Sequence, residues 1–195
     1  RLIRIIGTPG SGKTTIATLL ESRMVQAVLA DSEKEGYPEI IQALTACQFV
    51  RGGEQLVAAV RLPMEGEYRD FWELPYEETL KTRLVLALIQ ARAVLGLVRN
   101  IERRNPRTSI SFVLRQDAMA ALEEIGGATT ESILARAREV ERAVYDVGAR
   151  LVPPKPDAID QAAVRPFRPF DVIEAIEVTD VGGKKKTLKF LVILD

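Results

Sequence analysis

The spacing of apolar and polar residues along the chain predicts both strands and helices. Short apolar runs, several of them rich in β-branched residues, predict strands over 2–6, 56–62, 108–115 and 187–195. Apolar residues at three- and four-residue spacing predict amphipathic helices over 13–30, 40–47, 76–104, 117–127 and 129–151. For the short segment 171–178 we expect a brief helix, and for the proline-rich segment 152–170 mostly irregular structure with a turn of helix around Ile159.

The order of these segments predicts an α/β protein of the P-loop NTPase type, with a parallel sheet. Residues 1–75 contain a strand, a glycine-rich loop, helices and a second strand, which is typical of parallel crossovers. Residues 76–170 form a large, mainly helical insertion, and residues 171–195 return to the core and end in a strand. Because the chain begins at Arg1 without an initiator methionine, we expect it to be a fragment of a longer chain.

Composition excludes several kinds of chemistry. Lys plus Arg and Asp plus Glu number 27 each, so zero net charge gives no overall attraction to nucleic acid or to a membrane surface. The chain has one cysteine, Cys47, and no histidine, which excludes an internal disulfide, a His/Cys zinc site and a histidine-based triad. A lone cysteine fits a cytoplasmic location. The apolar stretch 84–98 is shorter than the ~20 residues that span a bilayer, so we expect a buried helix and no membrane partner.

The stretch "GTPGSGKTT" carries the strongest motif in the chain. Its spacing, Gly7-x4-Gly12-Lys13-Thr14, is that of a phosphate-binding (Walker A) loop between a strand and a helix. Glycines let successive backbone N–H groups wrap a phosphate, and the amino end of the following helix adds partial positive charge. We expect the nucleotide to be bound by Gly7, Thr8, Pro9, Gly10, Ser11, Gly12, Lys13, Thr14 and Thr15.

Two of these residues have a chemical role that their side chains define. Lys13 supplies a positive charge to the β- and γ-phosphates, and the Thr14 hydroxyl is a ligand for Mg²⁺. The expected cofactors are therefore ATP and Mg²⁺.

Such a site also needs a second strand, one that ends in a carboxylate. "LKFLVILD" is an apolar run that ends in Asp195, the pattern of a Walker B strand whose acid lies at the carboxyl edge of the sheet. We therefore expect Asp195 to be the second metal ligand and, with Lys13, a catalytic residue.

Three other segments carry charge that could bind a ligand, and in each a structural role is favoured. "GGKKK" (182–186) is expected to be a solvated turn and "RNIERRNPR" (99–107) a charged helix end, with anion binding as the alternative. "EYRDFWELPYEE" (67–78) is expected to anchor the long helix. Its carboxylates lack a clear metal-ligand spacing; they are Asp70, Glu73, Glu77 and Glu78.

The loop, the strand ending at Asp195 and several segments between them together resemble the bacterial AAA+ ATPases that are similar to origin-recognition initiators. The segments are "LIRIIGTPGSGKTT", "VAAVRLPMEGEYRDFWELPY", "LIQARAVLGLVRNIE", "REVERAVYDVGARLVPP" and "RPFDVIEAIEV…LKFLVILD". The resemblance implies an ATP-binding and ATP-hydrolysing core, one strand between the Walker A and Walker B strands, and function within a homo-oligomer or larger assembly. It also implies nucleic acid as a partner, which the balanced charge does not support. A catalytic glutamate, sensors, an arginine finger and a lid would lie after Asp195, so we expect this chain alone to bind MgATP weakly and hydrolyse it poorly.

Two alternatives remain open from the sequence. One is a small nucleotide-kinase-like phosphotransferase, which would be favoured if strand 2–6 paired directly with strand 188–194. The other is a regulatory or assembly module that binds nucleotide without turnover. An ABC-type ATPase is disfavoured because no "SGGQ"-like signature occurs.

Overall fold

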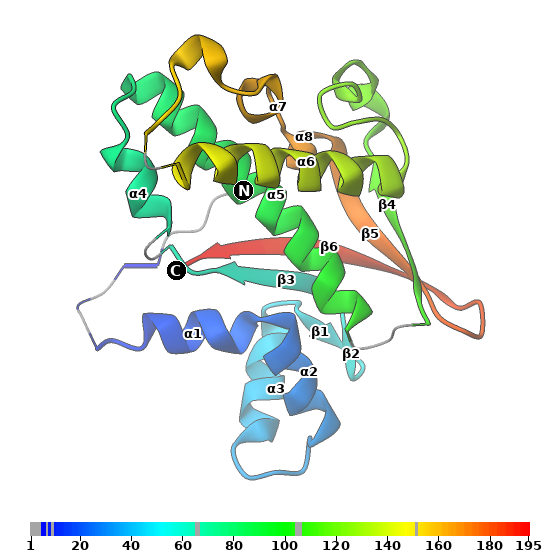
Figure 1. Cartoon of the computed structure of the whole chain (residues 1–195). Helices are drawn as coiled ribbons and strands as arrows, with labels where there is room; N and C mark the ends of the chain where they lie inside the picture. The colour runs from blue at the N-terminus through cyan, green and yellow to red at the C-terminus, as the bar shows by residue number, and fades with distance from the viewer. Residues whose placement is uncertain (1–4, 7, 9, 65–66, 104–106, 151) are drawn as a thin grey trace.

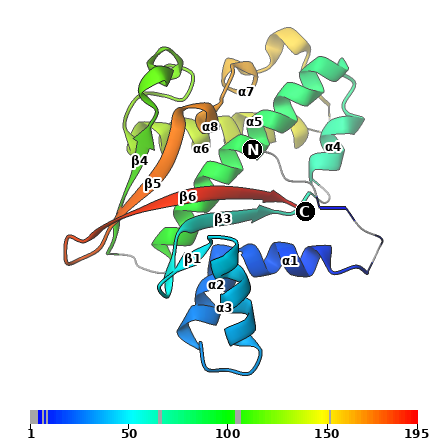
Figure 2. The ribbon, with the colours of Figure 1, turned by 180° about the vertical axis from the view of Figure 1, so that it is seen from behind.

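The computed structural model describes residues 5, 6, 8, 10–64, 67–103, 107–150 and 152–195. In this part of the chain a four-stranded sheet lies between helices on both faces (Figure 1). Helices α1 and α2 lie on one face with α3 beyond them, and α5 crosses the other face with α6 packed on it (Figures 1 and 2). The expected α/β class is confirmed.

The sheet has the strand order β3-β6-β5-β4 and is mixed rather than parallel. β3 (Val57–Leu62) pairs in parallel with the second half of β6 (Lys185–Leu194). β5 (Ile173–Thr179) pairs antiparallel with the first half of β6 and with β4 (Ser109–Leu114). The expectation of a parallel sheet therefore holds only for the pair β3–β6, and the rest of the described sheet is antiparallel. A turn at 180–184 joins β5 to β6 as a hairpin, which makes that pair antiparallel.

The segment predicted as one helix over 13–30 is broken in two. α1 (Lys13–Leu20) and α2 (Ser22–Ala30) are separated by Glu21, whose backbone is extended (φ −58°, ψ 136°). The break places Ser22 in the core, where its hydroxyl accepts hydrogen bonds from Ala59 N at 2.6 Å and from Gln55 Nε2 at 3.0 Å. α3 (Tyr37–Ala46) and a small hairpin of β1 (Val50–Arg51) and β2 (Glu54–Gln55) complete this side of the molecule.

The long helix predicted over 76–104 is α5 (Glu78–Glu102), the centre of the larger hydrophobic core. α6 (Thr130–Gly148) lies along it and begins at Thr129, whose hydroxyl accepts a hydrogen bond from Ser132 N. Within the described residues α5 alone is long and apolar enough to cross a membrane, and 56% of that stretch is buried in this fold.

Shorter elements cover the far side of α5 and α6. These are α4 (Glu67–Glu73), the 3₁₀ turns η1 (Gln116–Ala121) and η2 (Pro156–Ala158), α7 (Gln161–Val164) and α8 (Pro169–Val172). The helix expected over 117–127 is thus a 3₁₀ turn followed by further turns. The helix expected over 171–178 is wrong, because after α8 the chain continues as β5, whose inner residues Ile173, Ala175 and Ile176 are buried.

The strand expected over 2–6 falls mostly outside the described residues. Ile5 and Ile6 have no regular secondary structure, and their side chains are 50% and 80% exposed. The pairing that would separate a kinase-like strand order from the AAA+ order therefore stays untested. Among the described strands, the second half of β6 pairs with β3 on one side. On its other side β5 turns away from β6 (Figure 2).

Candidate functional site

The glycine-rich loop leads directly into α1. Gly10 and Gly12 both adopt φ of 80°, a conformation that residues with a β-carbon rarely take. Gly12 is the N-cap of α1 and makes no side-chain cap, so the first backbone N–H groups of this helix have no side-chain acceptor at the cap. Gly7 and Pro9 lie outside the described residues, whereas Thr8 and Ser11 form a turn in which Ser11 N donates to Thr8 O at 3.2 Å.

The ammonium group of Lys13 is folded back over the loop. Its Nζ donates to Thr8 O at 2.8 Å and to Ser11 Oγ at 3.4 Å. Both acceptors belong to the loop itself. The ammonium group can therefore exchange them for a phosphate held by the loop without a large movement. A lysine that bridges its own loop holds a positive charge over the turn.

The structure brings Thr14 and Asp195 together. Thr14 Oγ1 donates to Asp195 Oδ1 at 3.3 Å, although the two residues are 181 positions apart. Thr14 lies in the first turn of α1, and Asp195 follows the last residue of β6. The contact arises because α1 lies against the sheet with its amino end at the carboxyl end of the parallel pair β3–β6 (Figure 1).

Asp195 has a second partner, Arg61, that the sequence analysis did not identify. Arg61 Nη2 lies 2.6 Å and Nε 2.9 Å from Asp195 Oδ2, and both side chains are largely shielded, with 26% and 19% of their surface exposed. The only sequence signal for Arg61 was a charged residue near the end of the apolar run 56–62. Such a charge in a buried strand is stable only when it is paired.

Arg61 also ties the acid to the phosphate-loop helix. Its Nη1 donates to Thr18 Oγ1 at 3.1 Å, and Thr18 Oγ1 donates to Thr14 O at 2.8 Å. Three elements therefore meet in one hydrogen-bonded network: the end of β3, the end of β6 and the first two turns of α1. Thr15, the last residue of the predicted loop set, lies exposed on α1.

The oxygen atoms at this junction fit a magnesium ion. Mg²⁺ binds oxygen at 2.0–2.1 Å in octahedral geometry, which puts neighbouring ligands about 2.9 Å apart. The 3.3 Å between Thr14 Oγ1 and Asp195 Oδ1 is close to that spacing. No group of three or more Asp, Glu, Cys or His side chains that could hold a metal occurs among the described residues. A metal here would therefore take its other ligands from phosphate and water, as Mg²⁺ commonly does.

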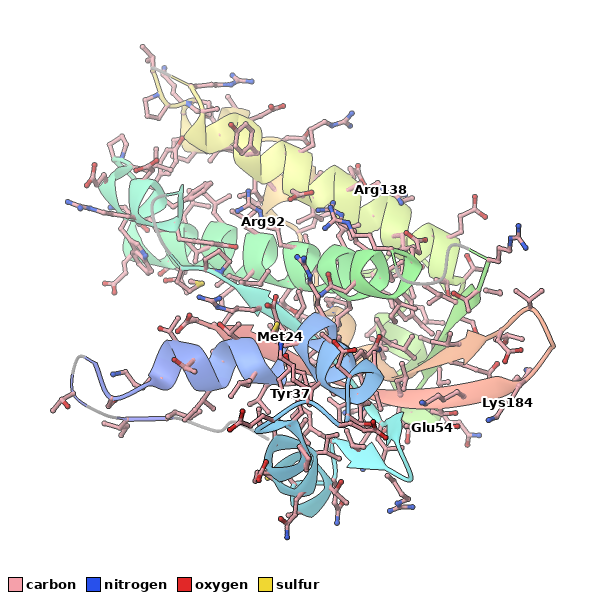
Figure 3. The ribbon with its side chains drawn as sticks, turned by 90° about the horizontal axis from the view of Figure 1, so that it is seen from below. Met24, Tyr37, Glu54, Arg92, Arg138 and Lys184 are labelled. Carbon is pink, nitrogen blue, oxygen red and sulfur yellow. The ribbon has the colours of Figure 1, made fainter. Side chains whose placement is uncertain are left out.

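Two of the other charged segments, 182–186 and 67–78, have structural roles in the described part of the chain. Lys184 and Lys186, from the "GGKKK" turn, both pair with Glu54 at 3.2 Å, and Figure 3 shows Lys184 and Glu54 side by side. These two lysines hold the pKa of Glu54 below its usual range. In the aromatic segment 67–78, Glu73 pairs with Arg69 at 3.3 Å, and Phe71 and Tyr76 are buried in the core of α5.

Comparison with known proteins gave no match to a family model, to a curated protein or to a solved structure.

Proposed function

We propose that this chain is a nucleotide-binding module of the P-loop NTPase superfamily that holds ATP with Mg²⁺, and that it is the nucleotide-loading part of an AAA+ type ATPase. The observation that carries the proposal is the meeting of Thr14 and Asp195 at 3.3 Å. The glycine-rich loop by itself points to phosphate binding but not to a bound metal. A hydroxyl on the helix that follows it, placed beside a carboxylate at the end of a distant strand, is the arrangement that a metal-bound triphosphate requires.

Each residue would contribute a separate interaction. Backbone N–H groups around Gly10 and Gly12 would donate to the phosphate oxygens, and Lys13 would leave Thr8 O to pair with the β- and γ-phosphates. Thr14 and Asp195 Oδ1 would hold Mg²⁺, which lowers the charge repulsion between the phosphates when bound. Arg61 would keep the Asp195 carboxylate oriented through Oδ2.

The test is the affinity for a fluorescent ATP analogue, titrated with Mg²⁺ and with EDTA. Lys13→Ala is expected to raise the Kd at least about tenfold, because a charge-assisted hydrogen bond to phosphate is lost. Lys155→Ala removes an exposed lysine beside the turn η2, far from the loop in sequence, and is the matched control. Equal Kd values for Lys13→Ala, Lys155→Ala and the unmodified chain would overturn the proposal.

The role of the acid is tested separately. Asp195→Asn is expected to remove most of the difference between titrations in Mg²⁺ and in EDTA, since a neutral amide is a poor ligand for Mg²⁺. Asp157→Asn, at an exposed turn, is the control for the same change of charge. If Asp195→Asn kept the full magnesium dependence, Asp195 would not be the metal ligand.

A further inference from the structure

A cavity of about 770 Å³ lies beside the outer edge of β3, and no described residue of the glycine-rich loop lines it. Its walls are the end of β3, the face of α5 from Arg92 to Arg103, Tyr68 of α4 and Glu141 of α6, with Glu21 between α1 and α2 at its margin. Figure 3 shows Arg92 on the side of α5 that faces α6.

A further strand cannot pair with β3 in this cavity, because backbone groups on that edge of β3 are already hydrogen-bonded. The backbone of Ala59, on the outer edge of β3, is already bonded: its N–H donates to Ser22 Oγ at 2.6 Å, and its carbonyl accepts from Asn100 Nδ2 at 3.3 Å. Side chains that bond to an edge strand in this way prevent it from pairing with a further strand. The occupant of the cavity must therefore be recognised through side chains.

Positive charge dominates the walls. Four guanidinium groups line the cavity against two carboxylates, those of Glu21 and Glu141. Two of the arginines are held by neighbours: Arg61 by Asp195 at 2.6 Å, and Arg92 by Glu141 at 3.2 Å. Arg92 also lies 5.5 Å from the centre of the Tyr68 ring.

The remaining two arginines, Arg99 and Arg103, are directed to no acid within the described part of the chain. Both are exposed. Arg99 lies in the last turn of α5, and Arg103, four residues later, is the C-cap with helical backbone angles, so the two lie on one face of the helix. Two like charges at this spacing repel each other, and an anion between them would remove that repulsion. The fork of a guanidinium group matches the oxygen atoms of phosphate, which it can bind through two hydrogen bonds.

We propose that this cavity is a second anion site, specific for a compact phosphate-bearing ligand, with Arg99 and Arg103 as the residues that bind the phosphate. The apolar residues Val60, Leu62 and Leu95 line the cavity beside them and can contact an uncharged part of the ligand. The two phosphate-binding arginines are not part of the proposed nucleotide site, although Arg61 lines the cavity and also pairs with Asp195.

The experiment uses inorganic pyrophosphate as the probe, measured by titration calorimetry on the Lys13→Ala chain at low salt. Lys13→Ala weakens the binding of phosphate by the glycine-rich loop, so the heat of binding that remains reports on the cavity. We expect binding in this background, and at least a tenfold rise in Kd when Arg99→Ala and Arg103→Ala are added. Arg83→Ala with Arg165→Ala is the matched control, since it removes two exposed arginines that do not line the cavity.

Two calorimetric outcomes would overturn the proposal: no binding in the Lys13→Ala chain, or an equal loss in both pairs of variants, which would show attraction to net charge alone. Amide chemical shifts give a second readout on the unsubstituted chain. Pyrophosphate in the cavity is expected to shift the signals of Gly96 and the Asn100 side chain, whereas pyrophosphate on the loop would shift those of Gly10 and Gly12. Shifts at the loop alone would reject the cavity and leave the proposed nucleotide site standing. Shifts at the cavity alone would support the cavity site and count against the proposed nucleotide site.

Discussion

The two oxygens of the Asp195 carboxylate face different partners. Oδ1 accepts a hydrogen bond from Thr14 at 3.3 Å, and Oδ2 lies 2.6 Å from Arg61 Nη2. A metal that approaches Oδ1 therefore need not displace the arginine. Arg61 acts as a positioning residue, because it holds the carboxylate in one orientation and is itself held by Thr18.

The pairing of Arg61 with Asp195 predicts a measurable coupling in stability. In urea unfolding we expect Arg61→Met and Asp195→Asn each to lower the free energy of unfolding by about 1–2 kcal/mol, and the double variant to lose about 1 kcal/mol less than the sum. The exposed pair Arg69 and Glu73, with 81% and 67% of the two side chains exposed, is the control. Its coupling should be below about 0.5 kcal/mol. Additive effects at Arg61 and Asp195 would contradict the assigned contact.

The phenol of Tyr76 predicts a loss of stability at alkaline pH. Its hydroxyl donates to Pro154 O at 2.7 Å, and burial raises the pKa of the phenol above its usual value. Because folding favours the neutral form, its contribution is complete below pH about 10 and declines as the pH rises through the raised pKa. We expect the free energy of unfolding to fall more steeply above pH about 10 in the unmodified chain than in Tyr76→Phe. Parallel curves for the two proteins would contradict this.

At the scale of elements, the sequence predicted most helices and strands, and its failures have local causes. The strand at 56–62, the long helix at 76–104 and the helix at 129–151 are confirmed because their apolar spacing is long and regular. The break at Glu21 was missed because nothing in the pattern of 13–30 shows that Ser22 must reach Ala59 on another strand. Segment 171–178 was misjudged because its strand pairs with β4 and β6, which are distant or follow it in sequence.

The approach of α5 to β3 predicts the effect of a substitution at Gly96. A β-carbon on Gly96 would lie 2.7 Å from Val60 Cγ2, closer than packed carbon atoms can be. Alanine favours a helix over glycine by about 1 kcal/mol, but overpacking costs about 1–3 kcal/mol. We therefore expect Gly96→Ala to lower the free energy of unfolding of the chain.

The same contact supplies the control for Gly96. In a Val60→Ala background the obstructing methyl groups are gone, so Gly96→Ala should become neutral or stabilising by up to about 1 kcal/mol. The comparison is made by thermal or urea unfolding of the four proteins. Stabilisation by Gly96→Ala in both backgrounds would show that α5 and β3 are farther apart than the structure has them.

At the scale of the whole molecule, the helices bury their apolar side chains more fully than the end of the sheet does. The core around α5 and α6 is large and buries Leu84, Leu88 and Val140 completely, as a run of amphipathic helices predicts. The sheet is different, since "LKFLVILD" has the continuous apolar character of a strand covered on both sides. In the structure its residues from Phe190 to Ile193 remain partly exposed. Such a run can be predicted as a strand, but its neighbours cannot, because pairing depends on segments far away in the chain.

Among the described residues, the second half of β6 has hydrogen-bonded neighbours on one side only, and this predicts an alternating pattern of amide exchange. The parallel register with β3, with Lys189 N bonded to Leu56 O and Asp195 N to Leu62 O, directs the amides of Leu191 and Ile193 toward β3. The amides of Phe190 and Val192 then face the other edge, where β5 has turned away and no described residue accepts from them. Hydrogen exchange followed by NMR should therefore be at least about tenfold slower for Leu191 and Ile193 than for Phe190 and Val192. Equal protection of all four amides would mean that a further strand covers this edge. If that protection grew with protein concentration, the strand would come from a second copy of the chain.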